Sequence, residues 1–157
     1  MPITDGRPDD SSTLTPFLCC APASEAIDFY CRVFGATVSE RMDGPDGTVV
    51  HAELALPQGR LELGDPNPAY GLVAPDPAAE AVTGSIGVYV PDVDAAFTAA
   101  VAGGARVREE PATFVTGDRY CSVVDPYGHR WSIMTRVEDV PREEARRRLD
   151  EWMAAQG

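Results

Sequence analysis

The sequence predicts an α+β fold made of two tandem βαβββ modules with an additional helix at the C-terminus. The main evidence is an internal repeat, since residues 34–40 (FGATVSE) reappear in similar form as residues 103–109 (GGARVRE). Each segment follows an Ala-rich helical stretch, which itself follows a short apolar run ending near Pro22 or Pro91. An internal repeat decides the fold more strongly than any single motif, and here it places the expected pocket between the two copies.

The first module is expected over residues 13–64. Residues 15–20 (TPFLCC) have the character of a strand. Ser24 is positioned to cap a helix over residues 25–34, which Gly35 would end. Turn-forming residues separate three further strands, expected at residues 36–42, 48–56 and 60–63.

The second module, over residues 84–135, is expected to repeat this order after a linker over residues 65–83 that is rich in Pro, Ala and Asp. Its helix would end near Val101 and be capped by Asp92 or Asp94. Strands are expected around that helix at residues 85–90, 105–109, 120–124 and 130–135.

Both ends of the chain extend beyond the repeat. Residues 1–12 are polar and acidic, and we expect a disordered tail there. This start lacks the basic region and apolar core of a signal peptide, so a cytoplasmic location is expected. Residues 136–157 form a C-terminal extension, in which residues 141–153 have the pattern of a helix with one apolar face.

The formal net charge of −12 argues against a nucleic-acid partner, whose phosphates would be repelled. No stretch approaches the length of a membrane span, so no membrane partner is expected either. The four cysteines show no metal-binding spacing, which favours reduced, buried thiols. The acidic charge permits a cationic ligand without requiring one.

Several short segments resemble the vicinal oxygen chelate superfamily, which includes glyoxalase I, ring-cleaving dioxygenases, fosfomycin-resistance enzymes and bleomycin-binding proteins. The resemblance covers residues 13–135, and its order and spacing are more specific than any one motif. The segments that carry it are AIDFY at 26–30, FGA at 34–36, VPDVDA at 90–95 and DPYG at 125–128. The segments VHAEL at 50–54, GDRY at 117–120 and HRWS at 129–132 resemble the PhnB-like branch in particular.

The resemblance implies that each module contributes a curved mixed sheet, with the helix on the convex face and the ligand on the concave face. It also implies paired sheets around a cavity. Sheet edges left open by such a fold are often covered by a second subunit, so we expect a homodimer.

Strand parity predicts which side chains face the ligand. Ala52, Leu54 and Leu56 share one face of their strand and should pack under the helix. The opposite face then carries His51 and Glu53, with Arg60 and Glu62 on the neighbouring strand. A short turn at residues 58–59 is expected to set Ala55 opposite Glu62.

The resemblance implies four inward metal ligands, one from the first and one from the last strand of each module. The corresponding positions here are Thr15, Glu62, Ser85 and Ser132. Only Glu62 is a competent ligand, so no cofactor is expected. A rebuilt site for Ni, Mn, Fe or Zn at His51, Glu53 and Glu62 remains the alternative.

Glu62 is the leading candidate for catalysis or cation binding, and the competing interpretation is an ion pair with Arg60 or Arg130. His51 could relay a proton or bind ligand, or be hydrogen-bonded to Glu53 within the wall. Arg119 could hold an anion, or form an internal salt bridge that pins its loop.

Other candidate ligand contacts lie on strands that should line the pocket. They are Phe17, Cys19, Tyr89 and Arg130, with Glu53 and the hydroxyl residues Thr15, Ser85 and Ser132. Aromatic walls suit planar ligands, although core filling explains Phe17 and Tyr89 equally well.

Three functions stay open from the sequence. The first is a metal-independent protein that binds or sequesters a planar or cationic small molecule, as bleomycin-resistance proteins do. The second is a metal-free lyase or isomerase with Glu62 and His51 as acid and base. The third is a metal-dependent lyase, isomerase or dioxygenase with altered ligands.

Overall fold

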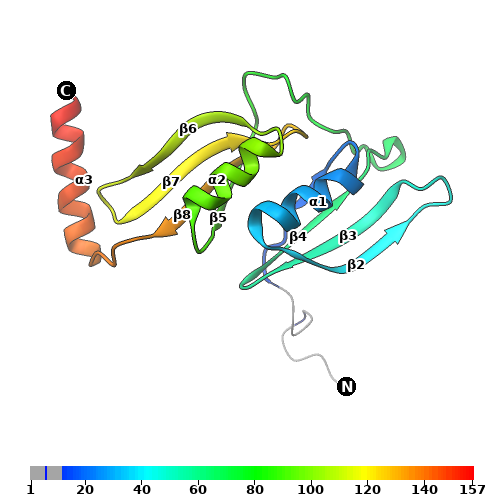
Figure 1. Ribbon diagram of the computed structural model, residues 1–157, viewed down its shortest axis with the longest axis horizontal. Coiled ribbons are helices and arrows are strands. Elements are labelled where there is room, and N and C mark those ends of the chain that lie inside the picture. The colour runs from blue at the N-terminus through cyan, green and yellow to red at the C-terminus, as the bar shows by residue number, and fades with distance from the viewer. Residues whose placement is uncertain (1–5, 7–11) are drawn as a thin grey trace. The chain divides into compact units, whose positions relative to one another are not determined.

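The structure is a computed structural model that describes residue 6 and residues 12–157. The expected disordered tail at residues 1–12 lies almost wholly outside these described residues. The chain divides into two compact units, Met1–Ala79 and Glu80–Gly157. Each unit contains a four-stranded mixed sheet with one helix against it (Figure 1). Within the described residues, no helix is both long and apolar enough to span a membrane.

The first unit has the predicted order of one strand, one helix and three strands. Its sheet has the order β1-β4-β3-β2, with β1 parallel to β4 and the other pairs antiparallel. The elements are β1 (Phe17–Cys19), α1 (Ala23–Phe34), β2 (Thr37–Asp43), β3 (Val49–Leu56) and β4 (Gly59–Gly64). A short 3-10 helix, η1 (Pro68–Tyr70), follows in the segment between the repeats.

The core of this unit lies between α1 and one face of the sheet. The residues of the sheet that are almost fully buried include Ala52, Leu54, Leu61 and Leu63. They alternate with the polar side chains of β3 and β4, as the parity of the strands predicts. Leu56 lies near the end of its strand and is only half-buried.

The register of the β3–β4 hairpin differs from the prediction. Ala55 pairs with Arg60, and Glu62 pairs with Glu53. The turn is tight, since Leu56 pairs with Gly59, so the strands meet two residues away from the expected alignment. Because side chains alternate along a strand, a shift of two residues leaves every side chain on its predicted face.

The start of α1 also differs from the prediction. Its N-cap residue is Pro22, which has no side-chain group that could accept a capping hydrogen bond. Ser24 lies inside the helix and therefore does not cap it. The carboxylate of Asp65 takes this role from the other end of the module. Its Oδ1 accepts from the Ala23 N–H at 3.0 Å and its Oδ2 from the Val49 N–H at 2.7 Å.

The second unit repeats the topology with the sheet order β5-β8-β7-β6, which confirms the predicted duplication. Its elements are β5 (Ser85–Tyr89), α2 (Val93–Ala102), β6 (Arg106–Thr113), β7 (Asp118–Val124) and β8 (Arg130–Arg136). Asp92 caps α2, because its Oδ1 accepts from the Ala95 N–H at 3.0 Å. Asp94, the alternative cap, instead pairs with Arg119.

The turn between β7 and β8 is organised by Asp125, which is 2 % exposed. Its carboxylate accepts from the backbone N–H groups of Tyr127 and His129, each at 2.9 Å. It also accepts from the Trp131 indole at 2.8 Å. The DPYG segment is therefore a structural feature of the second module.

The C-terminal helix α3 (Arg142–Gln156) belongs to the second unit and stands at the end of its sheet (Figure 1). It docks through few contacts. The Trp152 ring meets Phe114 edge-on at 5.2 Å, and both Arg148 Nη atoms donate to Glu138 at 2.9 Å. The α+β class with a C-terminal helix is thus as predicted.

Candidate functional site

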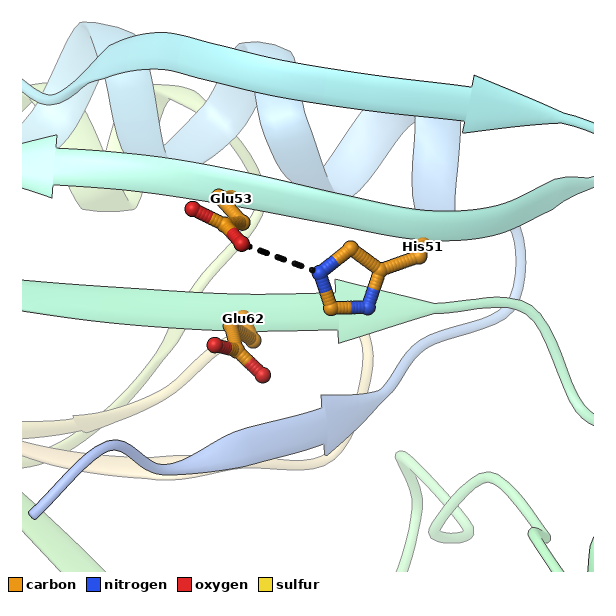
Figure 2. A group of neighbouring side chains, drawn as sticks. All are labelled: His51, Glu53 and Glu62. Carbon is orange, nitrogen blue, oxygen red and sulfur yellow. Dashed lines mark ion pairs between the residues drawn. The ribbon is translucent and has the colours of Figure 1, made fainter. Parts of the chain in front are cut away.

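The strongest concentration of polar side chains lies on the face of the first sheet that α1 does not cover. Phe17 on β1 pairs with Glu62 on β4, which pairs with Glu53 on β3, so the three form a row across the sheet. His51 precedes Glu53 by two residues and therefore shares this face. Figure 2 shows His51, Glu53 and Glu62 grouped on it. We call this surface, with Arg60, the first-module open face.

Glu53 is held between two neighbours. Its Oε2 lies 2.7 Å from Arg60 Nη1, and its Oε1 lies 3.5 Å from His51 Nε2. The side chains of Glu53 and Arg60 are only 17 % and 14 % exposed, so this pair is shielded from water. The arrangement orients His51 and neutralises one of the two carboxylates.

Glu62 differs from Glu53 in having no neutralising neighbour. Its carboxylate is half-buried and makes no hydrogen bond or ion pair to any residue that the structure describes. Arg60, one expected partner, is directed to Glu53. Arg130, the other, contacts Ser122 and Glu109 of the second unit. A half-buried carboxylate without a partner among the described residues is available to a ligand cation.

An aromatic pair borders Glu62. The rings of Phe17 and His51 lie 5.9 Å apart between centroids and are tilted by 34°. Gly64 makes this approach possible, because a Cβ there would lie 3.3 Å from Phe17 Cζ and 2.8 Å from the Val50 carbonyl oxygen. Gly64 was absent from the predicted site residues, although a glycine at the end of a predicted strand is a signal of close backbone approach.

Cys19 shares the parity of Phe17 on β1 but is 7 % exposed. Burial, with a smaller contribution from Asp65, raises the pKa of this thiol. A raised pKa reduces the thiolate fraction at neutral pH, so Cys19 is suited to packing and not to nucleophilic attack.

The donors at the positions implied for a family metal do not fit a divalent ion. Thr15 precedes β1 and its hydroxyl lies 3.2 Å from the Ser12 hydroxyl. Ser85 and Ser132 supply neutral hydroxyls 3.4 Å from each other. Glu62 is the one carboxylate in this set, and hydroxyls are weak ligands beside imidazole and carboxylate.

A different trio has better donors for a metal. His51, Glu53 and Glu62 each offer a ligand atom, all within 4.8 Å of one another. Two ligands on opposite sides of an ion with bonds of about 2.1 Å lie about 4.2 Å apart, so small rotations could bring the trio to one ion. Such an ion would have to share Glu53 with Arg60, whose positive charge opposes it.

The second sheet also presents a face away from its helix, which we call the second-module open face. Ser85 on β5 pairs with Arg130 on β8, and Ser132 pairs with Ser122 on β7. The structure thus brings three of the predicted ligand contacts, Ser85, Arg130 and Ser132, onto one surface. Tyr89 shares it by parity, and its hydroxyl donates to Asp118 Oδ2 at 3.3 Å.

Arg119 is placed elsewhere. It donates two hydrogen bonds of 2.7 Å to the Asp94 carboxylate on α2. These hydrogen bonds from Arg119 hold the pKa of Asp94 below its ordinary value. This internal salt bridge therefore links β7, which carries Arg119, to α2, which carries Asp94. The sequence left such a salt bridge as the alternative to anion binding by Arg119.

Two βαβββ modules, each with a helix on one sheet face and polar side chains on the other, define a fold class shared by enzymes and binding proteins. The Glyoxalase/Bleomycin resistance protein/Dioxygenase superfamily profile matches residues 15–133, and the chain belongs to this superfamily.

Individual proteins are similar to this chain over most of its length. An uncharacterised protein of Mycobacterium bovis is 35 % identical over 146 residues, covering 92 % of this chain and 93 % of its own. A Pseudomonas aeruginosa protein structure matches with a TM-score of 0.65 at 21 % identity, over 80 % of this chain and 98 % of its own. A Bacillus cereus PhnB protein matches with a TM-score of 0.59 at 20 % identity, over 79 % of this chain and 99 % of its own. The two structures demonstrate a shared fold.

Proposed function

We propose that this protein binds a small organic molecule that carries a planar group and a positive charge, and that the first-module open face is its binding surface. The observation that carries the proposal is the Glu62 carboxylate, half-buried and without a partner among the described residues, beside the Phe17–His51 pair. A ligand cation would neutralise Glu62, and a ligand ring would lie against the aromatic side chains.

The electrostatics of the face support an organic cation in preference to a metal ion. Arg60 already neutralises Glu53, so one carboxylate charge is left for a ligand. An organic cation with a single positive charge would neutralise the one remaining carboxylate, that of Glu62. A divalent metal ion would also need Glu53 as a ligand, and Glu53 is already paired with Arg60. The formal net charge of −12 adds attraction for cations at low ionic strength, where it is screened least. Binding is therefore proposed to be independent of metal.

A second candidate is an enzymatic reaction on the same face. The contact between Glu53 and His51 orients the imidazole beside Glu62, which would place an acid and a base next to a bound compound. This activity would be a lyase or isomerase reaction, in which Glu62 takes a proton from the substrate and His51 returns one.

The proposal is tested with benzamidinium, a planar aromatic cation, and benzamide, its neutral isostere. We expect saturable benzamidinium binding by calorimetry or NMR, unaltered by a chelator, with benzamide binding at least about tenfold more weakly, the equivalent of one charged hydrogen bond. Glu62→Gln should remove this preference for the cation, while Glu25→Gln, at an exposed position of α1, should retain it.

Equal affinities for the two probes, or an unchanged Glu62→Gln variant, would refute the proposed surface. Stoichiometric retention of Ni, Mn, Fe or Zn by the purified protein would replace the organic cation with the metal alternative. Turnover of a natural ligand that is lost in Glu62→Gln while binding of a neutral analogue remains would identify the enzyme.

The proposal extends to assembly and location. All seven residues of β2 are exposed along an edge of the first sheet, which a second subunit could cover. We therefore propose a cytoplasmic homodimer. A monomer mass by light scattering at micromolar concentration would contradict the dimer, and recovery from an extracytoplasmic fraction would contradict the location.

A further inference from the structure

We propose that the second-module open face binds an oxyanion, namely the carboxylate or phosphate group of a small ligand, through Arg130 and the hydroxyls of Ser85 and Ser132. The inference concerns a different unit from the Glu62 surface and stands independently of the proposed function.

Arg130 is fixed on this face by a buried serine. Its Nε donates to Ser122 Oγ at 3.0 Å, and Ser122 is only 1 % exposed. With Nε engaged, the guanidinium is held in one orientation and its Nη groups are left for other acceptors. Ser122 therefore acts as a positioning residue for Arg130.

Two hydroxyl donors lie beside the guanidinium. Ser85 stands directly across from Arg130, and Ser132 follows Arg130 by two residues on the same face. The Ser85 and Ser132 oxygens are 3.4 Å apart, the spacing at which two hydroxyls can donate to one anionic group. A planar guanidinium with adjacent hydroxyls matches carboxylate and phosphate geometry.

The charges around Arg130 leave room for an anion. Within the described part of the chain, the acid in ion-pair range is Glu109, whose Oε2 lies 4.0 Å from Arg130 Nη2, beyond hydrogen-bond distance. Arg106 occupies the same row of the sheet on β6, but Glu80 Oε2 lies 3.8 Å from its Nη1, so the proposed site depends on the charge of Arg130. Repulsion from the net charge of the chain is screened beyond about 8 Å at physiological ionic strength.

The side chains of this proposed site are unsuited to a metal cation. Guanidinium and hydroxyl groups supply no anionic oxygen or imidazole nitrogen for a metal ion. The positions that the family resemblance associates with metal ligands in this module therefore have the chemistry of an anion site.

The experiment is an NMR titration of the full chain with inorganic phosphate and, separately, with acetate, against chloride at equal ionic strength and pH. Saturable shifts of the Arg130 side-chain Nε–H and of the Ser85 and Ser132 amides are expected. Preference for phosphate or for acetate identifies which oxyanion the site takes.

Charge variants make the test specific. Arg130→Gln should weaken binding at least about tenfold, while Arg142→Gln, an exposed charge on α3, should leave it unchanged. Glu109→Gln should tighten binding several-fold, because it removes the carboxylate that competes for Arg130. Ser132→Ala provides a milder variant should Arg130→Gln fail to fold.

Shifts that follow chloride as well as phosphate and acetate, or equal weakening by Arg130→Gln and Arg142→Gln, would overturn the inference. Glu62→Gln should leave anion binding unchanged, so failure of this inference and failure of the cation surface are distinguishable.

Discussion

Glu62 stands directly across from Glu53 in the sheet, yet only Glu53 is neutralised, by Arg60 at 2.7 Å. Two like charges at a cross-strand position repel each other. Arg60 offsets this repulsion at Glu53, whereas the Glu62 carboxylate has no partner within the described residues. This asymmetry is the physical basis for assigning ligand binding to Glu62 and an orienting role to Glu53.

Glu62→Gln is expected to stabilise the unliganded protein. Removing the like-charge contact should raise the free energy of unfolding by about 0.5 kcal/mol, measured by urea denaturation. Glu53→Gln should do the opposite and lower it by about 1–2 kcal/mol, because it removes the negative charge that neutralises the shielded Arg60 and leaves only a neutral amide acceptor. Destabilisation by Glu62→Gln would indicate a structural role that the static contacts do not reveal.

Asp65→Ala is expected to lower the free energy of unfolding by about 2–3 kcal/mol, since it deprives two backbone N–H groups of their acceptor. These belong to Ala23 at the start of α1 and Val49 at the start of β3, both buried. Asp46→Ala, in an exposed turn, is the matched control. Equal midpoints for the two variants in urea would show that Asp65 is not the link between α1 and the sheet.

Docking of α3 is expected to weaken at low pH. Hydrogen bonds from Arg147, then Arg148, lower the pKa of Glu144 from 4.5 to about 2, and those from Arg148 also lower the pKa of Glu138. Carboxyls with lowered pKa values contribute stability that is complete above their ordinary pKa and lost as pH falls through the lowered value. Glu138 joins α3 to the preceding segment through Arg148, which Glu144 holds from within the helix, so the Trp152 indole resonance should shift as pH falls below about 4.5.

Arg148→Gln should move this transition to higher pH, because Glu138 and Glu144 then titrate nearer their ordinary pKa values. Arg146→Gln, an exposed charge on the same helix, serves as the control. The same transition in both variants would indicate that α3 is held by the Phe114–Trp152 contact without help from these ion pairs.

The repeated segments at 34–40 and 103–109 were sufficient to predict the topology, because a duplicated sequence order builds a duplicated βαβββ unit. Strand parity was sufficient to place His51, Glu53 and Glu62 on one face, since alternation depends only on position along the strand. The cavity expected between the two copies stays a prediction.

The pairing of residues between neighbouring strands could not be predicted correctly from the sequence. The predicted alignment of Ala55 with Glu62 was two residues away from the observed one, because turn geometry sets register. The sequence also did not predict that Asp65, and not Ser24, accepts a hydrogen bond at the start of α1, since Asp65 and Ala23 are distant in sequence.

The sequence alone therefore determined the module order, the buried and open faces, and the types of side chain on each face, because these follow from local periodicity and repetition. The tertiary structure decided which charges meet. It brought Arg60 to Glu53, left Glu62 without a described partner, and fixed Arg130 on Ser122. These outcomes depend on strand register and rotamers, which are set by packing across the sheet and not by position along the chain.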